Sequence, residues 1–109
     1  MSLSEYRGMW LVAMFDLPVV TKTERRQYAR FRKALLKDGF VMLQFSVYAR
    51  YCASEDASVA HRKSIKLSLP PEGQVRVVTL TDRQFGKMEV FLGKKRKETE
   101  TAPAQMEFF

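Results

Sequence analysis

One apolar segment near the start of the chain constrains the fold more than any other. Residues 9–15 are apolar without alternation, and Asp16 follows them directly. A run of this kind is typical of a central strand that is covered on both faces. Pro18 ends the strand, because proline has no backbone N–H to donate to a neighbouring strand. The sequence therefore places one carboxylate, that of Asp16, at the carboxyl end of a buried central strand.

A strongly basic helix is predicted to follow this strand. Thr21 or Thr23 can cap its first turn, where Glu24 is favourable, and Gly39 suits the left-handed residue that ends a helix. At 100° per residue, one side carries Tyr28, Phe31 and Leu35. The opposite side carries a row of cations with no acid among them, here called the basic stripe: Lys22, Arg26, Arg30, Lys33 and Lys37. A merely solvated face normally mixes charges, so we expect the basic stripe to contact phosphates.

Two further segments complete the middle of the chain. Residues 40–52 are rich in β-branched and aromatic side chains, and they form either a tight hairpin with a turn near Phe45-Ser46 or one long bent strand. Ser54 then caps a second helix that runs to about Leu69. Its apolar side is predicted to consist of Ala57, Ala60, Ser64 and Leu67.

The order of the predicted elements indicates the fold. Residues 70–73 form a turn, and residues 74–81 form a strand of alternating, β-branched character. Strand, helix, strand pair, helix and strand in this order are typical of an α+β, ferredoxin-like βαββαβ fold, with the helices on one face of an antiparallel sheet. The other face must be solvated, cover a ligand or pack against a second copy.

The residues after this core suggest how two copies associate. Residues 85–92 alternate imperfectly and predict an extra C-terminal strand, which needs a free sheet edge that a second copy can supply. We therefore predict a homodimer with Met88, Val90 and Phe91 at the interface. The domain is assigned to residues 1–92. Residues 93–109 are assigned to a basic, flexible tail, which contains the run 94–97 and ends in Phe108-Phe109.

Composition excludes several classes of function. A chain of 109 residues has room for one domain, and its net charge of +7 favours a polyanionic partner. The single cysteine, Cys52, allows neither an intramolecular disulfide nor a cysteine zinc site, and the single histidine, His61, is expected on a solvated helix face. No apolar run approaches the roughly 20 residues that span a bilayer, so we expect a cytoplasmic protein.

Asp16 admits two interpretations on its chemistry alone. It can hold a divalent metal, but a single carboxylate binds magnesium weakly unless phosphates or a second copy add oxygen ligands. Alternatively, it can cap the next loop by accepting hydrogen bonds from the amides of residues 19–21. Neither a nucleophilic triad nor a glycine-rich phosphate loop is present in the sequence.

The chain resembles the CRISPR-associated protein 2 family over roughly residues 9–92. The resemblance rests on an ordered set of motifs: Phe15-Asp16-Leu17-Pro18, Arg25-Arg26-Gln27-Tyr28, Phe31-Arg32, Gly39-Phe40, Gln44-Phe45-Ser46-Val47-Tyr48 and the strand 75–81. It implies a ferredoxin-like homodimer whose final strands pack across the interface. It also implies that Asp16 is the catalytic residue and the Mg²⁺ or Mn²⁺ ligand of an endonuclease that cuts single-stranded RNA or duplex DNA.

The same resemblance implies a role in spacer acquisition. Members of the family bridge dimers of the integrase, the CRISPR-associated protein 1 family, while duplex DNA lies along their basic surface. By position, the nucleic-acid-binding residues here would be Lys22, Arg25, Arg26, Arg30 and Lys33. Two hypotheses therefore stay open: a metal-dependent nuclease centred on Asp16, and a non-catalytic DNA-binding adapter in which Asp16 is structural. A third, a generic single-strand RNA-binding domain, lacks the expected glycine-aromatic motif.

Overall fold

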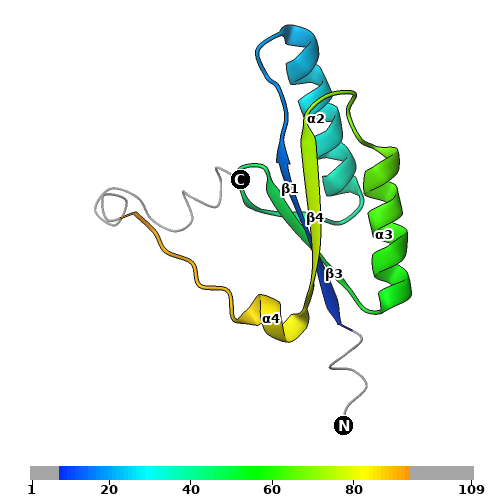
Figure 1. The fold of residues 1–109 in the computed structure, drawn as a ribbon, viewed down its shortest axis with the longest axis vertical. Helices are drawn as coiled ribbons and strands as arrows, with labels where there is room; N and C mark the ends of the chain where they lie inside the picture. Colours follow the sequence, from blue (N-terminus) through cyan, green and yellow to red (C-terminus); the bar gives the residue numbers. More distant parts are fainter. Residues whose placement is uncertain (1–7, 94–109) are drawn as a thin grey trace.

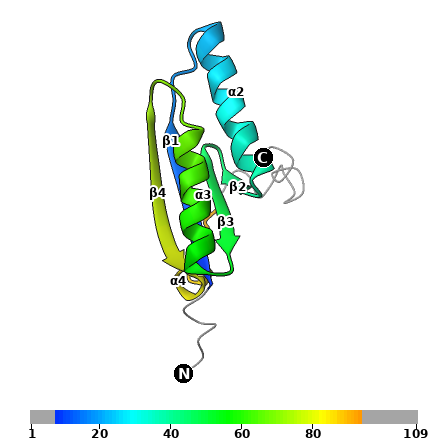
Figure 2. The same cartoon turned by 90° about the vertical axis from the view of Figure 1, so that its right-hand side faces the viewer.

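Four antiparallel strands form one sheet, and two long helices cover one of its faces. The computed structural model describes residues 8–93. Its elements are β1 (Met9–Asp16), α2 (Lys22–Lys37), β2 (Val41–Gln44), β3 (Val47–Cys52), α3 (Glu55–Leu67), β4 (Gln74–Thr81) and α4 (Asp82–Gly86). The strand order is β2-β3-β1-β4, and α2 and α3 lie on the same face (Figures 1 and 2). The predicted α+β, ferredoxin-like βαββαβ order is confirmed.

β1 is the central strand, as its apolar sequence predicted. It pairs antiparallel with β3 on one side and with β4 on the other, so both of its edges are hydrogen-bonded. Only one of its faces is covered by helices, however. Trp10 and Met14, which point to the opposite face, are half-buried, whereas Leu11 and Ala13 are fully buried. Val12, on the same open face, is buried, so the expectation that both faces of β1 are covered holds only at the middle of the strand in the single chain.

The core lies between the sheet and the two long helices. The cluster of buried side chains consists of Leu11, Ala13, Phe15, Leu17, Phe31, Leu35, Phe40, Tyr48, Cys52 and Ile65. Phe15 is at its centre, edge-on to Phe31 with ring centroids 5.1 Å apart and stacked with Tyr48 at 5.7 Å. Each such aromatic pair contributes about 0.5–1.5 kcal/mol beyond the burial of apolar area. The first of these contacts joins β1 to α2, and the second joins β1 to β3.

α2 begins and ends where the sequence predicted. The Thr21 hydroxyl accepts a hydrogen bond from the Glu24 amide, and Glu24 Oε1 accepts one from the Thr21 amide, which is a complete capping box. Asp38 is the C-cap residue of α2, and Gly39 follows it with φ +88°. Phe31 and Leu35 are buried and Tyr28 is half-buried, so the predicted apolar side is confirmed.

The segment after α2 is a hairpin rather than one bent strand. β2 and β3 pair antiparallel, with a two-residue turn at Phe45 and Ser46. Ser46 has φ +62°, a conformation that glycine or asparagine usually supplies. The Ser46 carbonyl accepts a hydrogen bond of 3.0 Å from the Phe15 amide, and this contact stabilises the unusual turn. The hairpin alternative, with its turn near Phe45-Ser46, is therefore confirmed, although no Asn-Gly or Asp-Gly pair marks the turn.

α3 is capped by Ser54 as predicted, but it buries a different side. Leu67 is 81% exposed, and Ala60 and Ser64 are exposed as well, so the predicted apolar side is wrong at these positions. The buried residues are Ser58 and Ile65. Ser58 tolerates burial because its hydroxyl donates a hydrogen bond of 2.7 Å to the Glu55 carbonyl.

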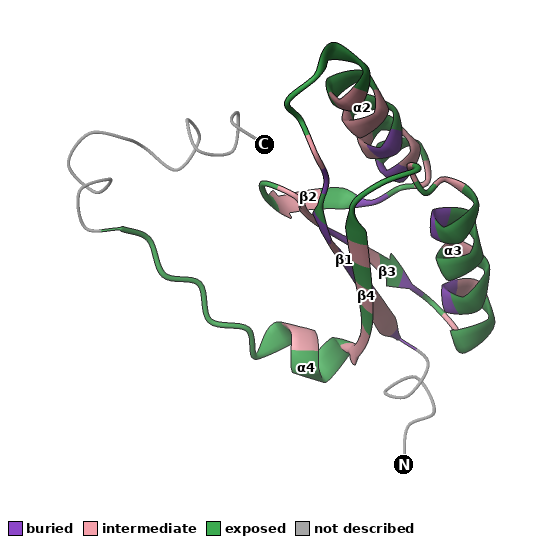
Figure 3. Cartoon of the chain, turned by 45° about the horizontal axis from the view of Figure 1, so that its top comes forward, coloured by how far each residue is buried: buried purple, intermediate pink, exposed green. Residues whose placement is uncertain are grey.

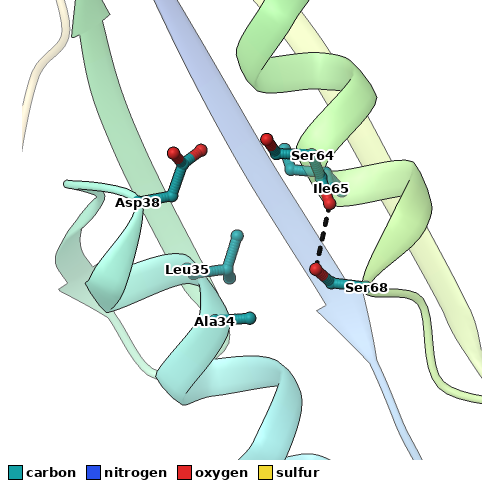
Figure 4. A pocket seen from close by; sticks show the side chains of 6 residues that line it. All are labelled: Ala34, Leu35, Asp38, Ser64, Ile65 and Ser68. Atoms are coloured by element: carbon teal, nitrogen blue, oxygen red, sulfur yellow. Dashed lines mark hydrogen bonds between the residues drawn. The ribbon is translucent and has the colours of Figure 1, made fainter.

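His61 joins the two long helices, which corrects its expected place on a solvated face. It is half-buried, and its Nδ1 lies 2.8 Å from Asp38 Oδ2 at the end of α2. A cavity of about 10 Å³, room for one water, lies beside this contact. Figure 4 shows the side chains that face each other across it: Ala34, Leu35, Asp38, Ser64, Ile65 and Ser68.

The residues after β4 do not form the predicted extra strand. Asp82–Gly86 is the short helix α4, which starts with a second capping box between Thr81 and Gln84. Phe85 stacks on Trp10 with ring centroids 3.9 Å apart, and Trp10 Nε1 donates a hydrogen bond of 2.8 Å to Asp82. Residues 87–93 have no regular structure and are exposed along their length (Figure 3). The prediction of a strand over 85–92 is wrong for the single chain, because the capping box of Thr81 and Gln84 starts a helix here.

Two further expectations concern membrane-spanning segments and the C-terminal tail. No helix among residues 8–93 is long and apolar enough to cross a bilayer. The tail assigned to residues 93–109, including the basic run and Phe108-Phe109, lies outside the described residues apart from its first position.

We predict that Tyr48→Phe stabilises the protein. Tyr48 is fully buried, and its hydroxyl has no hydrogen-bond partner among the described residues. Burial raises the pKa of this phenol, an effect that the Arg32 guanidinium opposes. Removing an unpaired buried hydroxyl should raise the free energy of unfolding by about 1 kcal/mol, measured by urea unfolding at fixed protein concentration.

The matched control is Tyr28→Phe. The Tyr28 hydroxyl is 2.9 Å from Ser46 Oγ, so its removal breaks a hydrogen bond and should lower the free energy of unfolding by about 1 kcal/mol. A loss of stability in Tyr48→Phe equal to that in Tyr28→Phe would contradict the assignment of an unpaired hydroxyl.

Candidate nucleic-acid and metal site

Asp16 is displayed at the end of β1 on the face of the sheet that α2 and α3 leave open. It is exposed and lies opposite Gln74 of β4, with Met14 and Arg76 forming the neighbouring pair. Because side chains alternate along a strand, all four share the open face. They line an open depression of about 190 Å³, together with Phe15. Gln74 and Arg76 were not predicted as site residues, because only the pairing register of β1 and β4 brings them beside Asp16.

The Asp16 carboxylate does not cap the following loop. The amides of Val20 and Thr21 donate instead to Glu24 Oε1, at 3.0 and 2.9 Å. Within residues 8–93, no hydrogen bond or ion pair to the Asp16 side chain is present. If Asp16 capped this loop, its carboxylate would accept these hydrogen bonds, but Glu24 accepts them instead. The Asp16 carboxylate therefore remains available to a ligand.

The metal-binding capacity of one copy is small. Among residues 8–93, no three His, Cys, Asp or Glu side chains lie close enough to hold a metal ion together. Asp16 therefore fits Mg²⁺ or Mn²⁺ as a single ligand, and the other oxygens must come from water, phosphate or a second copy. Arg76 supplies a positive charge at the same depression, which suits a phosphate better than a resident metal.

The basic stripe is fully available to an anionic partner. Its five members are exposed along α2, and none forms an ion pair within the described part of the chain: Lys22, Arg26, Arg30, Lys33 and Lys37. Arg25 is exposed too, but its Nη1 donates to the carbonyls of Val20 at 2.6 Å and Val19 at 3.3 Å. Arg25 thus stabilises the loop between β1 and α2. The structure brings the nucleic-acid residues of the prediction together on one helix, and their role stays a prediction.

The predicted interface residues lie beyond α4. Met88, Val90 and Phe91 are 45%, 77% and 83% exposed. Large apolar side chains so close together along the chain are seldom all exposed in a protein that has no partner. The stack of Phe85 on Trp10 anchors α4 against β1 and fixes where this segment leaves the domain. In Figure 1 the segment extends away from the sheet and from α3. No contact within residues 8–93 explains its apolar side chains.

The sequence matches a known family over nearly all of the described domain. The family model for the CRISPR associated protein Cas2 matches residues 9–88. The chain belongs to the Cas2 family. This confirms the resemblance that the motifs around Asp16, α2 and the hairpin indicated.

Several relatives in the family are similar over their whole length, and each is named CRISPR-associated endoribonuclease Cas2. The Parvibaculum lavamentivorans protein is 50% identical over 101 residues, which cover 93% of this chain and 100% of that relative. The Flavobacterium psychrophilum protein is 49% identical over 107 residues, 98% of this chain and 93% of the relative. The Paracidovorax avenae protein is 43% identical over 107 residues, 98% and 99% of the two chains.

The position of Asp16 depends on the close approach of Gly73. Gly73 has φ +100°, and a Cβ at this position would lie 2.8 Å from the Asp16 carbonyl oxygen and 2.6 Å from Leu17 Cδ2. We predict that Gly73→Ala lowers the free energy of unfolding by about 1–3 kcal/mol, because it adds both backbone strain and a clash with backbone. Urea unfolding measures the change.

Gly86→Ala is the control for this substitution. Gly86 lies in α4, and a Cβ there would have no heavy atom within 4 Å. The substitution should be neutral or stabilise by up to about 1 kcal/mol. Equal effects of the two substitutions would show that Gly73 does not hold the end of β1.

Proposed function

We propose that this Cas2 family member is a metal-dependent endonuclease of CRISPR adaptation that acts as a homodimer. The observation that carries the proposal is the exposed Asp16 carboxylate, unbonded within the described residues and placed beside Arg76 in an open depression. The names of the relatives, endoribonuclease, support single-stranded RNA as a substrate, with duplex DNA as the alternative.

Asp16 and Arg76 have distinct parts in this proposal. Asp16 supplies one oxygen ligand to Mg²⁺ or Mn²⁺, which when bound provides Lewis-acid activation of a phosphodiester. The Arg76 guanidinium, on the adjacent position of β4, neutralises a phosphate oxygen in the same depression. The basic stripe on α2 holds the rest of the nucleic acid through its backbone.

A homodimer explains both the acid count and the exposed apolar surface. One copy provides a single carboxylate at the depression, and a two-fold axis near Asp16 would bring a second. The open face of the sheet carries Trp10 and Met14, and the segment beyond α4 exposes Met88, Val90 and Phe91. We assign these surfaces to the contact between copies, because large exposed apolar patches mark protein interfaces.

The second candidate function is a non-catalytic adapter. The observation that favours it is the contrast between the five cations of the basic stripe, none of which is paired within residues 8–93, and the single carboxylate of Asp16. In this role duplex DNA lies along α2, and the dimer links copies of the integrase, the CRISPR-associated protein 1 family. Asp16 is then dispensable, which separates the two candidates.

Cleavage assays with Asp16→Asn test the nuclease proposal. Labelled single-stranded RNA and duplex DNA are incubated with Mg²⁺, Mn²⁺ or chelator, and product is quantified on denaturing gels. Loss of the Asp16 carboxylate should lower the cleavage rate by about 100-fold or more, several kcal/mol in the barrier. Asp56→Asn is the control, because Asp56 is an exposed acid in the first turn of α3. Equal cleavage by both variants would leave the adapter role.

Salt titration tests the basic stripe under either function. Binding through several Lys and Arg releases counterions, so duplex affinity should fall steeply as salt rises. Reversing Arg26 and Arg30 to glutamate should reduce the slope of log affinity against log salt by about 0.9 for each phosphate that the helix no longer neutralises. Fluorescence anisotropy measures both quantities. Affinity that does not change with salt would refute phosphate binding by the stripe.

A further inference from the structure

A second surface, on the far side of α3 from α2, has no part in the proposed function. A groove of about 720 Å³ lies between α3 and the edge strand β4, which Figure 2 shows side by side. The groove is lined by Val59, Arg62, Lys63, Ile65, Lys66, Leu67, Leu69, Val75 and Val77. We call it the α3/β4 groove. Its volume falls within the range of ligand pockets, about 300–1,000 Å³.

The walls of the α3/β4 groove expose large apolar side chains. Val59, Leu67 and Leu69 are 52%, 81% and 48% exposed. They belong to one stretch of the chain, and no other described element covers them. Apolar side chains clustered in a groove, rather than scattered singly, mark a binding surface. The occupant must therefore carry apolar side chains of its own.

The charge on this groove is entirely positive. Its lining includes Arg62, Lys63 and Lys66 but no carboxylate. Arg62 is held over β4 by a hydrogen bond of 2.6 Å from its Nη2 to Thr79 Oγ1, whereas Lys63 and Lys66 are exposed and make no ion pair among the described residues. A fitting occupant is therefore apolar and acidic at once.

The chain itself contains a segment of this composition. Residues 98–109 include three glutamates and neither lysine nor arginine, in contrast to the basic run 94–97 just before them. The same segment ends in apolar side chains at Met106, Phe108 and Phe109. Its charge and its aromatic groups complement those of the α3/β4 groove.

The segment is long enough to reach the groove. The 16 residues after position 93 span at most about 53–58 Å when fully extended. The longest dimension of the protein is 49 Å, so the groove on the same copy is within reach. Residues 87–93 lead away from α3 in Figure 1, so the test must distinguish docking within one copy from docking between two.

We propose that the acidic, aromatic segment 98–109 docks in the α3/β4 groove, on its own copy or on a second one. Phe108 and Phe109 pack against the apolar walls, and the glutamates face Lys63 and Lys66. Docking neutralises cations that would otherwise attract phosphates, so nucleic acid is directed to the basic stripe on α2. This inference does not depend on whether Asp16 cleaves anything.

Photo-cross-linking of the full chain tests the proposal. Phe108 is replaced by p-benzoylphenylalanine, and cross-linked peptides from nuclease-treated protein are identified by mass spectrometry. We expect cross-links to residues 59–69 and 75–77, with isotope-mixed samples separating contacts within a copy from contacts between copies. Either kind supports the proposal. Cross-links confined to other surfaces, or none, would overturn it.

A charge exchange supplies the second arm. Lys63→Glu with Lys66→Glu should lower the cross-linking yield by about threefold to tenfold, the effect of turning two exposed attractions into repulsions. Glu98→Lys with Glu100→Lys should restore it. The control is Lys33→Glu with Lys37→Glu, which changes net charge equally on α2 and should leave the yield unchanged.

Duplex DNA is the alternative occupant of the α3/β4 groove, and a measurement of DNA affinity distinguishes it from the segment 98–109. With the groove neutralised by the segment, Lys63→Glu with Lys66→Glu should leave DNA affinity close to that of the wild type. A loss of affinity as large as that caused by reversing the stripe, with no change in cross-linking, would assign the groove to nucleic acid and overturn the proposal. Because neither readout measures cleavage, an inactive Asp16 would leave both results interpretable.

Discussion

The pairing of β1 along both of its edges is the constraint on which the rest of the structure depends. Its helix-facing side chains, with Phe15 at the centre, form the core against α2 and α3. Its other face and its carboxyl end remain open, so the same strand displays Asp16 to solvent. The close approach of Gly73 and the capping box of Glu24 hold that end without using the Asp16 carboxylate. β1, paired on both edges, thus presents an acid whose carboxylate has no partner among residues 8–93.

Local signals predicted most of the fold. The unbroken apolar run indicated β1, and Thr21, Glu24 and Gly39 marked α2, because caps act within a few residues. The errors arose where tertiary contacts overrode local pattern. α3 turns Leu67 outward because Ile65 packs into the core cluster and His61 contacts Asp38 at the end of α2. Residues after β4 form α4 because Trp10, distant in sequence, stacks on Phe85.

The candidate site was predictable only in part for the same reason. Asp16 and the basic stripe follow from position along one strand and one helix, which the sequence contains directly. Gln74 and Arg76 join Asp16 through the register between β1 and β4, and nothing in the sequence between them specifies that register. Arg25 was grouped with the phosphate-binding cations, yet its guanidinium also bonds the loop carbonyls. The roles of Gln74, Arg76 and Arg25 thus depend on which residues lie beside them in the folded chain, and residue type alone does not predict them.

A single carboxylate per chain makes the second copy part of the proposed chemistry. Wild-type and Asp16→Asn chains, refolded together in equal amounts, produce mixed dimers in statistical proportion, and RNA cleavage by the mixture is compared with the wild type. If the two Asp16 side chains act on one metal, activity should fall to about one quarter, because only dimers with two wild-type copies function. Activity of about one half would mean that each copy works alone, and would contradict a shared site.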